Sequence, residues 1–264
     1  MTASELFHAG QLREAIDAQI AKVKAQPADQ PARFFLFELF LFAGELDRAR
    51  KQLDVLRYDE PRHAAAIEQY KFALDSETKR QAVFAGTGQP KWLTAVADHV
   101  RLRLEALAYI ARHEWAEARK RLDDANGAVP SLTGTLNGKP FEGLYDADER
   151  FGTVLEVFGT GGVYSWVPLE QVASLTASAP ASPRDIILRP AHLVTSDGVE
   201  GDVLLPGLYP LSQAHASDAV RLGRETEWTG GAVAIGSGGR TLLAGGEAIP
   251  LVNVTEIILG QSGG

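Results

Sequence analysis

The sequence predicts an α+β fold in which an N-terminal helical array precedes a small, antiparallel, β-rich and barrel-like domain. Residues 1–128 hold 19 Lys and Arg, 19 Asp and Glu and 5 Gly, whereas residues 129–264 hold 7, 15 and 21. Apolar residues recur at helical spacing in the first part, and short apolar runs between glycine-rich turns fill the second. We therefore expect a helical domain over residues 1–130 and a β-rich domain over residues 131–264.

A six-residue motif recurs at a fixed spacing in the helical part. Gly10-Gln-Leu-Arg-Glu-Ala15 reappears 34 residues later as Gly44-Glu-Leu-Asp-Arg-Ala49, and a proline follows 17 residues after each glycine. A weaker third copy begins at His113, again with a proline 17 residues on. This period is typical of the tetratricopeptide repeat (TPR), a helix-turn-helix unit whose arrays usually bind other proteins. The repeat therefore favours a binding role over an enzymatic one.

Apolar spacing and chain breaks predict the individual helices. Stripes at intervals of three and four residues mark the helices around the repeated motif, and Gly44 is expected to close the aromatic helix before it. A strong break is expected at residues 86–90, where two glycines precede a proline. The helices are expected at residues 12–23, 34–42, 46–56, 62–82, 91–112 and 115–126.

Short strands are expected beyond residue 130. Residues 154–158 and 163–167 are predicted to pair across the glycine turn at 159–162. A phosphate site at this turn would need a helix directly after the glycines, and a strand is expected there instead. Further strands are expected at residues 185–188, 192–196, 203–206, 220–224, 233–236, 240–244 and 252–259.

Composition excludes several classes of function. The chain has no cysteine, so thiolate catalysis and cysteine-ligated zinc are ruled out. The acidic second half argues against a nucleic-acid partner, which needs clustered Lys and Arg. No signal peptide or apolar run of about 20 residues is present. We expect a cytoplasmic protein that does not contact a membrane.

Candidate catalytic and metal-binding groups are weak. Asp146, Asp148 and Glu149 form an acidic cluster beside Arg150, for which a solvated or Arg-paired arrangement is favoured over a metal site. Ser212 and Ser217 lie near His215 and Asp218 in the sequence, but no nucleophile-elbow motif surrounds them. We therefore expect no catalytic residues, no cofactor and no bound metal.

The aromatic helix at residues 34–42 is the candidate binding surface. Its five phenylalanines lie on several faces, more than a two-layer array buries on one side. Core packing is the alternative and must hold for some of them. In the repeat register set by Gly44, four residues fall on the concave face, where an apolar groove suits an amphipathic helix. The predicted partner-binding residues are Phe34, Glu38, Leu41 and Phe42.

The order of several longer motifs resembles the ImpE family, also called TagJ or SciE, of bacterial type VI secretion. The clearest are Asp146-Ala-Asp-Glu-Arg-Phe151, Val154-Leu-Glu-Val157 and Tyr164-Ser-Trp-Val-Pro168. Others lie at residues 83–88, 183–190, 198–210 and 221–228, so the resemblance covers nearly the whole chain.

This resemblance implies a non-enzymatic accessory protein of the secretion machinery. It implies contact with the N-terminal helix of the small sheath subunit TssB and a link to ClpV, the ATPase that recycles the sheath. The family supplies no established catalytic residues. The alternative is a chaperone-like scaffold for another secretion component or an effector.

Overall fold

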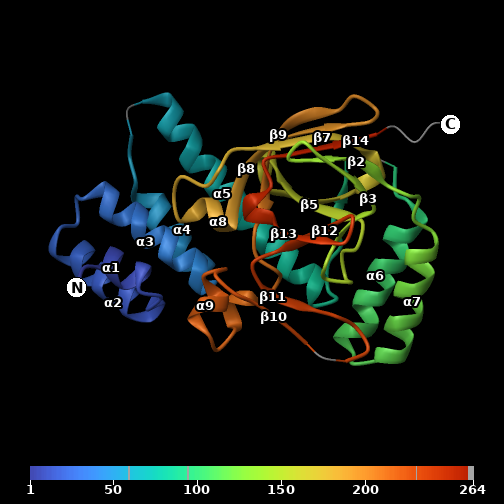
Figure 1. The fold of residues 1–264 in the computed structure, drawn as a ribbon. Coiled ribbons are helices and arrows are strands. Elements are labelled where there is room, and N and C mark those ends of the chain that lie inside the picture. Colours follow the sequence, from blue (N-terminus) through green and yellow to red (C-terminus); the bar gives the residue numbers. More distant parts are fainter. Residues whose placement is uncertain (59, 94, 230, 261–264) are drawn as a thin grey trace.

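Helices lie at both ends of a body of β-sheets. The computed structural model describes residues 1–58, 60–93, 95–229 and 231–260. Helices α1 to α4 form one end of the molecule and the α6–α7 hairpin the other, with the sheets between them (Figure 1). Among the described residues, none of the helices combines the length and the apolar character needed to span a bilayer.

The first half is helical apart from one short strand. The two shortest helices, α8 and α9, interrupt the strands of the second half. The helices are α1 (Ala3–His8), α2 (Leu12–Ala25), α3 (Gln30–Ala43), α4 (Leu46–Val55), α5 (Pro61–Phe84), α6 (Asp98–Ala111), α7 (Trp115–Gly127), α8 (Arg184–Ile187) and α9 (Asp218–Arg221).

The strands follow in chain order, and short 3-10 turns lie in some of the connections. They are β1 (Lys91–Trp92), β2 (Thr133–Leu136), β3 (Lys139–Glu142), β4 (Leu144–Asp146), β5 (Val154–Gly159), β6 (Val163–Pro168), β7 (Val172–Ala177), β8 (Leu188–Thr195), β9 (Glu200–Pro206), β10 (Thr226–Trp228), β11 (Gly236–Gly238), β12 (Thr241–Ala244), β13 (Glu247–Pro250) and β14 (Glu256–Leu259).

The repeated motif forms the turn of each helix hairpin. Gly10 and Gly44 lie between paired helices with φ of 81° and 69°, the left-handed region that glycine enters without strain. His113 holds the same place in the third copy at φ 60°. The alanines five residues after these positions, Ala15, Ala49 and Ala118, are fully buried, because the two helices cross closely there.

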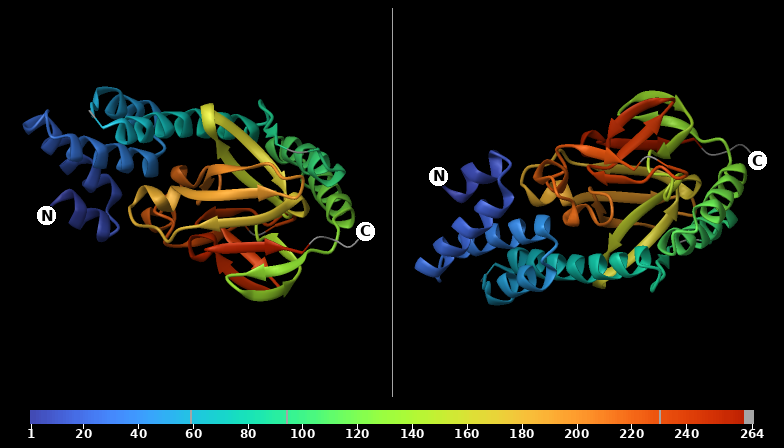
Figure 2. Two further views of the ribbon diagram at one scale, coloured as in Figure 1. Left: turned by 90° about the horizontal axis from the view of Figure 1, so that it is seen from above. Right: turned by 90° about the horizontal axis from the view of Figure 1, so that it is seen from below.

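Helix α5 connects the two ends of the molecule. It runs along the side of the sheet body from the N-terminal helices to the α6–α7 hairpin (Figure 2), and it confirms the helix expected at residues 62–82. The helix expected from residue 91 was wrong in its start. Pro90 precedes a two-residue strand instead, and β1 pairs in parallel with β6 before α6 begins at Asp98.

The main sheet has nine strands and is open. Its order is β1-β6-β5-β9-β8-β7-β14-β2-β3, and every pair except β1 with β6 is antiparallel. The α+β class is confirmed, but the described strands form no closed barrel. Two small sheets, β13-β12-β4 and β10-β11, pack nearby.

Two of the expected strands are short helices. Residues 185–188 were expected to be extended, but α8 forms there because the Asp185 carboxylate accepts hydrogen bonds from the backbone N–H groups of Ala181 and Ser182. Residues 220–224 lie mainly in and after α9, whose Asp218 accepts a hydrogen bond from Leu12 N–H. Each helix is thus held by a hydrogen bond to backbone N–H groups outside the segment that was predicted to be a strand.

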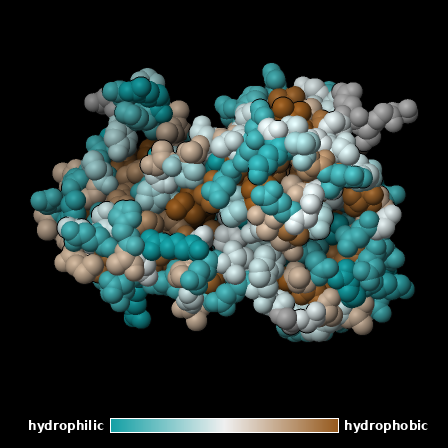
Figure 3. Space-filling view, in the orientation of Figure 1, coloured by the Kyte–Doolittle hydropathy of each residue, from teal (hydrophilic) through white to brown (hydrophobic). Residues whose placement is uncertain are grey.

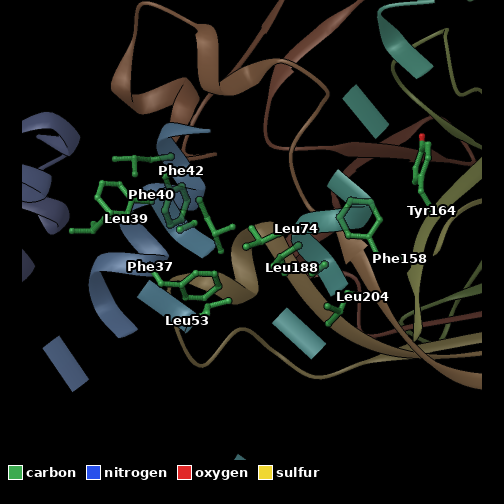
Figure 4. Packing of buried hydrophobic residues seen from close by; sticks show 14 of the residues in the cluster. Phe37, Leu39, Phe40, Phe42, Leu53, Leu74, Phe158, Tyr164, Leu188 and Leu204 are labelled. Carbon is green, nitrogen blue, oxygen red and sulfur yellow. The ribbon is translucent and has the colours of Figure 1, made fainter. Parts of the chain in front are cut away.

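The hydrophobic core runs through both halves of the chain. One cluster extends from Phe42 in α3 through Leu74 in α5 to Phe158 and Leu204 in the sheet (Figure 4). Strand β5 alternates: Val154 and Phe158 belong to this cluster, and Leu155 and Val157 pack into a second cluster on the other face. The change from helices to strands falls between Gly127 and Thr133, and the two-domain division at residue 130 stays a prediction.

We predict that Gly44→Ala lowers the free energy of unfolding by about 1–2 kcal/mol or more, because alanine resists the left-handed conformation. The added Cβ would also lie 2.2 Å from Gln213 Cγ. Gly127→Ala is the control: its Cβ would meet nothing within 4 Å, and it should stabilise by up to about 1 kcal/mol. Urea unfolding of both variants checks this, and equal effects would contradict the strained-turn account.

Candidate functional site

The four predicted partner-binding residues lie together on α3 but are largely covered. Phe42 is 0% exposed, Glu38 5% and Leu41 7%, and Phe34 is half-buried. Phe42 packs against the ring of Phe7, with 5.3 Å between centroids. Figure 4 shows Phe42 among the buried side chains of the core. Phe42 therefore contributes to the core in this conformation.

Helix α8 of the same chain covers this face of α3. Arg184 Nη1 donates a hydrogen bond of 2.7 Å to Glu38 Oε1, and its Nε donates one of 2.6 Å to the Tyr70 hydroxyl. The Arg184 guanidinium also lies 5.0 Å from the centre of the Phe34 ring. Burial raises the pKa of Glu38, and the Arg184 charge acts against this rise. The structure thus gathers Phe34 and Glu38 around Arg184.

Leu41 and Phe42 border the next part of the same contact. They line a narrow cavity of about 30 Å³ with Ile187 and Gln213 from the second half of the chain. In the space-filling view, apolar residues show at the surface between the N-terminal helices and the sheet body (Figure 3). The whole predicted face therefore meets residues of its own chain, and binding of a partner there stays a prediction.

A network of buried charges lies deeper, between α5 and the sheets. Glu156 in β5 is 0% exposed. Its two carboxylate oxygens accept hydrogen bonds of 2.8 Å from Arg80 Nε and Nη2 of α5, and a further one of 2.8 Å from Arg240 Nη1. The Tyr164 hydroxyl donates a hydrogen bond to the same carboxylate, and Trp166 Nε1 donates one to the Tyr164 hydroxyl.

Arg240 extends this network to the acidic cluster. Its Nη2 donates a hydrogen bond of 2.6 Å to Asp146 Oδ2, and the Tyr209 hydroxyl donates to Asp146 Oδ1 at 2.8 Å. Arg80 Nη2 also donates to the backbone oxygen of Leu208. Two buried arginines thus face two buried carboxylates, as buried charges require.

The other members of the acidic cluster each have an arginine of their own. Arg150 Nη2 lies 2.5 Å from Asp148 Oδ2, and Arg119 Nη1 lies 2.5 Å from Glu149 Oε1. The cluster is therefore Arg-paired, one of the two favoured alternatives, and Asp146 and Asp148 are buried rather than solvated. Within the described ranges, no group of three or more potential ligands could hold a metal ion.

Burial and the neighbouring charges shift the pKa values of the residues in this network. Burial acts to raise the pKa of Glu156, but the charges of Arg80 and Arg240 outweigh it and hold that pKa below its ordinary value. Burial raises the pKa of Asp146, against the Arg240 charge. The pKa of Arg80 is raised, because Glu156 and Glu77 more than offset its burial. The surroundings therefore favour the charged forms of Glu156 and Arg80.

The sequence pattern missed most of this network. Asp146 was singled out for its acidic neighbours, but Arg80, Glu156 and Arg240 were not. The available signal was the single carboxylate inside the otherwise apolar run Val154-Leu-Glu-Val-Phe158, because a charge buried in a strand requires a partner. Its partners lie 76 and 84 residues away, and no local pattern identifies them.

Ser217 contacts His215 only through its backbone N–H, which donates to His215 Nδ1, and the other groups serve separate contacts. Ser212 Oγ donates to the backbone oxygen of Tyr209 and accepts from Gly238 N–H. His215 Nε2 lies 3.3 Å from Glu227 Oε2, whereas the Asp218 carboxylate receives Arg221 Nη1 at 2.8 Å. The structure does not bring these groups together as nucleophile, base and orienting acid.

We predict that Glu156→Gln lowers the free energy of unfolding by about 3–5 kcal/mol, because it leaves buried arginines without their carboxylate. Glu247→Gln is the matched control. Glu247 is exposed and lies 3.7 Å from the exposed Lys139, and its loss should change stability by less than about 0.5 kcal/mol. Chemical denaturation of both variants checks this, and an equal small effect would contradict a structural role for the network.

The effect of Glu156→Gln should also depend on pH. The pKa of Glu156 is lowered by folding, so its stabilisation is complete above its ordinary pKa of 4.5 and is lost as the pH falls through the lower value. The stability difference between wild type and variant should therefore be largest at neutral pH and shrink below pH 4.5. Asp146 is present in both proteins, so its opposite shift largely cancels. A difference that grows on acidification would contradict this.

Comparisons with known proteins find relatives of this chain in both sequence and fold. A family model described as "ImpE protein" matches residues 138–258. The chain is 36% identical over 236 residues to the "Type VI secretion system accessory component TagJ" of Pseudomonas aeruginosa, covering 89% of this chain and 84% of that protein. A crystal structure of a Vibrio parahaemolyticus protein shares the fold, with a TM-score of 0.88 and 22% identity over 98% of this chain and 97% of that one.

The family match includes the residues that build the buried network. Asp146, Glu156 and Arg240 all fall inside the matched segment, and Arg80 of α5 completes their contacts from outside it. The resemblance expected from the order of the motifs is confirmed by identity along most of both chains. The chain belongs to the ImpE family.

Proposed function

We propose that this chain is a non-enzymatic accessory protein of a bacterial type VI secretion system. It acts in the cytoplasm, binds the N-terminal helix of the small sheath subunit TssB and links it to recycling of the sheath by ClpV. The observation that carries the proposal is the 36% identity, over 89% of the chain, to a protein named as an accessory component of that system. The link to ClpV rests on the family resemblance.

The structure supports this role through the α1–α4 helix hairpins. Stacked hairpins of this kind present surfaces that accept a helix. The network around Glu156 supports a non-enzymatic role, since its buried carboxylates and arginines are paired with one another. The site that we propose is the face of α3 formed by Phe34, Glu38, Leu41 and Phe42.

Binding at this face requires α8 to move. Helix α8 is only four residues long, and none of its residues is fully buried. Its polar contacts with α3 and α5 come from one side chain, Arg184, through Glu38 and Tyr70. A partner helix with a basic residue beside apolar ones would replace these contacts in kind. Phe34 would contact it first, because it is half-buried whereas Glu38, Leu41 and Phe42 are buried.

We predict that a peptide of the TssB N-terminal helix binds the full-length chain and that Arg184→Ala tightens this binding. The variant removes the side chain that competes for Glu38. Phe34→Ala and Glu38→Gln should each weaken binding by about tenfold, the loss of one well-placed contact. Isothermal titration calorimetry measures all four proteins.

The control for these variants is Trp115→Ala. Trp115 is 40% exposed and lies in α7, at the opposite end of the molecule (Figure 1), so peptide affinity should not change. Unchanged peptide affinity in Arg184→Ala, Phe34→Ala and Glu38→Gln would exclude this face as the binding site. TssB would remain the proposed partner in that case. No binding at high micromolar peptide would refute TssB as the partner, and capture of another secretion component would favour the scaffold role.

A further inference from the structure

A cavity of about 600 Å³ lies where the α6–α7 hairpin meets the sheet body. Its walls come from α6, from the segment that follows α7, and from β4 and the turn before β5. Val129, Leu132 and Leu144 give it an apolar side. Arg103 and Thr153 give it a polar one. Neither the predicted partner face nor the residues of α8 contribute to it.

Arg103 is a buried cation without a carboxylate partner among the described residues. It is 1% exposed, and its guanidinium donates only to neutral groups. Nη1 bonds the backbone oxygen of Glu149 at 2.9 Å, and Nη2 bonds Asn126 Oδ1 at 2.6 Å. These bonds use two of its five N–H donors, and Nε has no partner within the described ranges.

Three other buried arginines differ from Arg103 in this respect, whereas Arg189 of β8 likewise donates only to backbone oxygens among the described residues. Arg80, Arg150 and Arg240 each contact a buried carboxylate at 2.8 Å or less. A buried charge normally has such a partner, because loss of hydration is otherwise uncompensated. Burial accordingly lowers the pKa of Arg103 to about 10, so that the side chain is still charged at neutral pH.

A second unsatisfied group belongs to another residue that lines the cavity. Thr153 Oγ1 is buried and has no hydrogen-bond partner in the described part of the chain. Its neighbour Gly152 packs directly on Arg103: a Cβ there would lie 2.3 Å from Nη2. Arg103 and Thr153 thus both line the cavity and both have polar atoms without a partner among the described residues.

The acids that also line the cavity are already neutralised. Arg240 Nη2 lies 2.6 Å from Asp146 Oδ2, and Arg119 Nη1 lies 2.5 Å from Glu149 Oε1. Arg103 is the cavity-lining arginine that has no carboxylate within 4.0 Å among the described residues, although the charges of Glu149 and Glu170 act on it from farther away. The wall therefore favours a ligand with a single negative charge, and the apolar side favours one with a hydrocarbon part.

We propose that this cavity binds a small organic monocarboxylate, whose carboxylate pairs with Arg103 and Thr153 and whose apolar part lies against Val129, Leu132 and Leu144. A carboxylate matches the planar guanidinium better than a spherical anion does. Such a ligand would touch both the helix hairpin and the sheets and would stabilise their contact. This site does not depend on the proposed binding of TssB.

Titration of the full-length chain with hexanoate tests the proposal, with the uncharged isostere hexanamide as the comparison ligand. Ligand-observed NMR and calorimetry should give saturable binding of hexanoate with a dissociation constant on the order of 1 mM, as expected for so small a ligand. Hexanamide should bind at least about tenfold more weakly, since it lacks the charge-assisted bond.

Three variants locate the binding. Arg103→Gln should abolish the preference for hexanoate, and Arg121→Gln, whose half-buried side chain pairs with the exposed Glu105 on the same hairpin, should leave it unchanged. Ser131→Trp fills the cavity from an exposed lining position and should block hexanoate without unfolding the chain, which covers the case in which Arg103→Gln does not fold. Equal binding of both ligands, no binding at about 10 mM, or full binding to Ser131→Trp would overturn the proposal.

Discussion

The constraint on which the fold depends is the complete burial of the Glu156 carboxylate in the middle of β5. A carboxylate at that depth is tolerated only with cations and hydrogen-bond donors around it. Arg80 reaches it from α5 and Arg240 from the segment before β12, while Tyr164 adds its hydroxyl. Three distant segments must therefore meet at one point, which fixes where α5 lies on the sheet.

The same network gives a structural role to residues of the three sequence motifs that carry the family resemblance. Asp146, Asp148 and Arg150 belong to one motif, Glu156 to the next, and Tyr164 and Trp166 to the third. All six are buried, and their side chains bond one another or the arginines that face them. These motifs thus specify the junction between helices and sheets. The presence of these motifs in another chain would therefore indicate the same fold more directly than the same binding surface.

Because α5 is fixed on the sheet, the N-terminal hairpins are not a free-standing array. Arg184 of α8 and the residues near Gln213 lie against α3, where a ligand of a helical repeat array would be expected. The second half of the chain thus covers the aromatic surface of the first. The polar part of this contact is one arginine, Arg184, between Glu38 and Tyr70.

The sequence by itself determined the elements that depend on local rules. The left-handed glycines of the repeat, the buried alanines, the span of α5 and the hairpin of β5 and β6 all follow from spacing and turn chemistry. Only the tertiary structure decided that residues 185–187 are helical, that Lys91 and Trp92 join the sheet, and that the sheet stays open. It alone paired Glu156 with Arg80 and Arg240 and left Arg103 beside a cavity without a carboxylate. The physical reason is that burial and charge compensation act between segments far apart in the chain, whereas a sequence pattern reports only on neighbours.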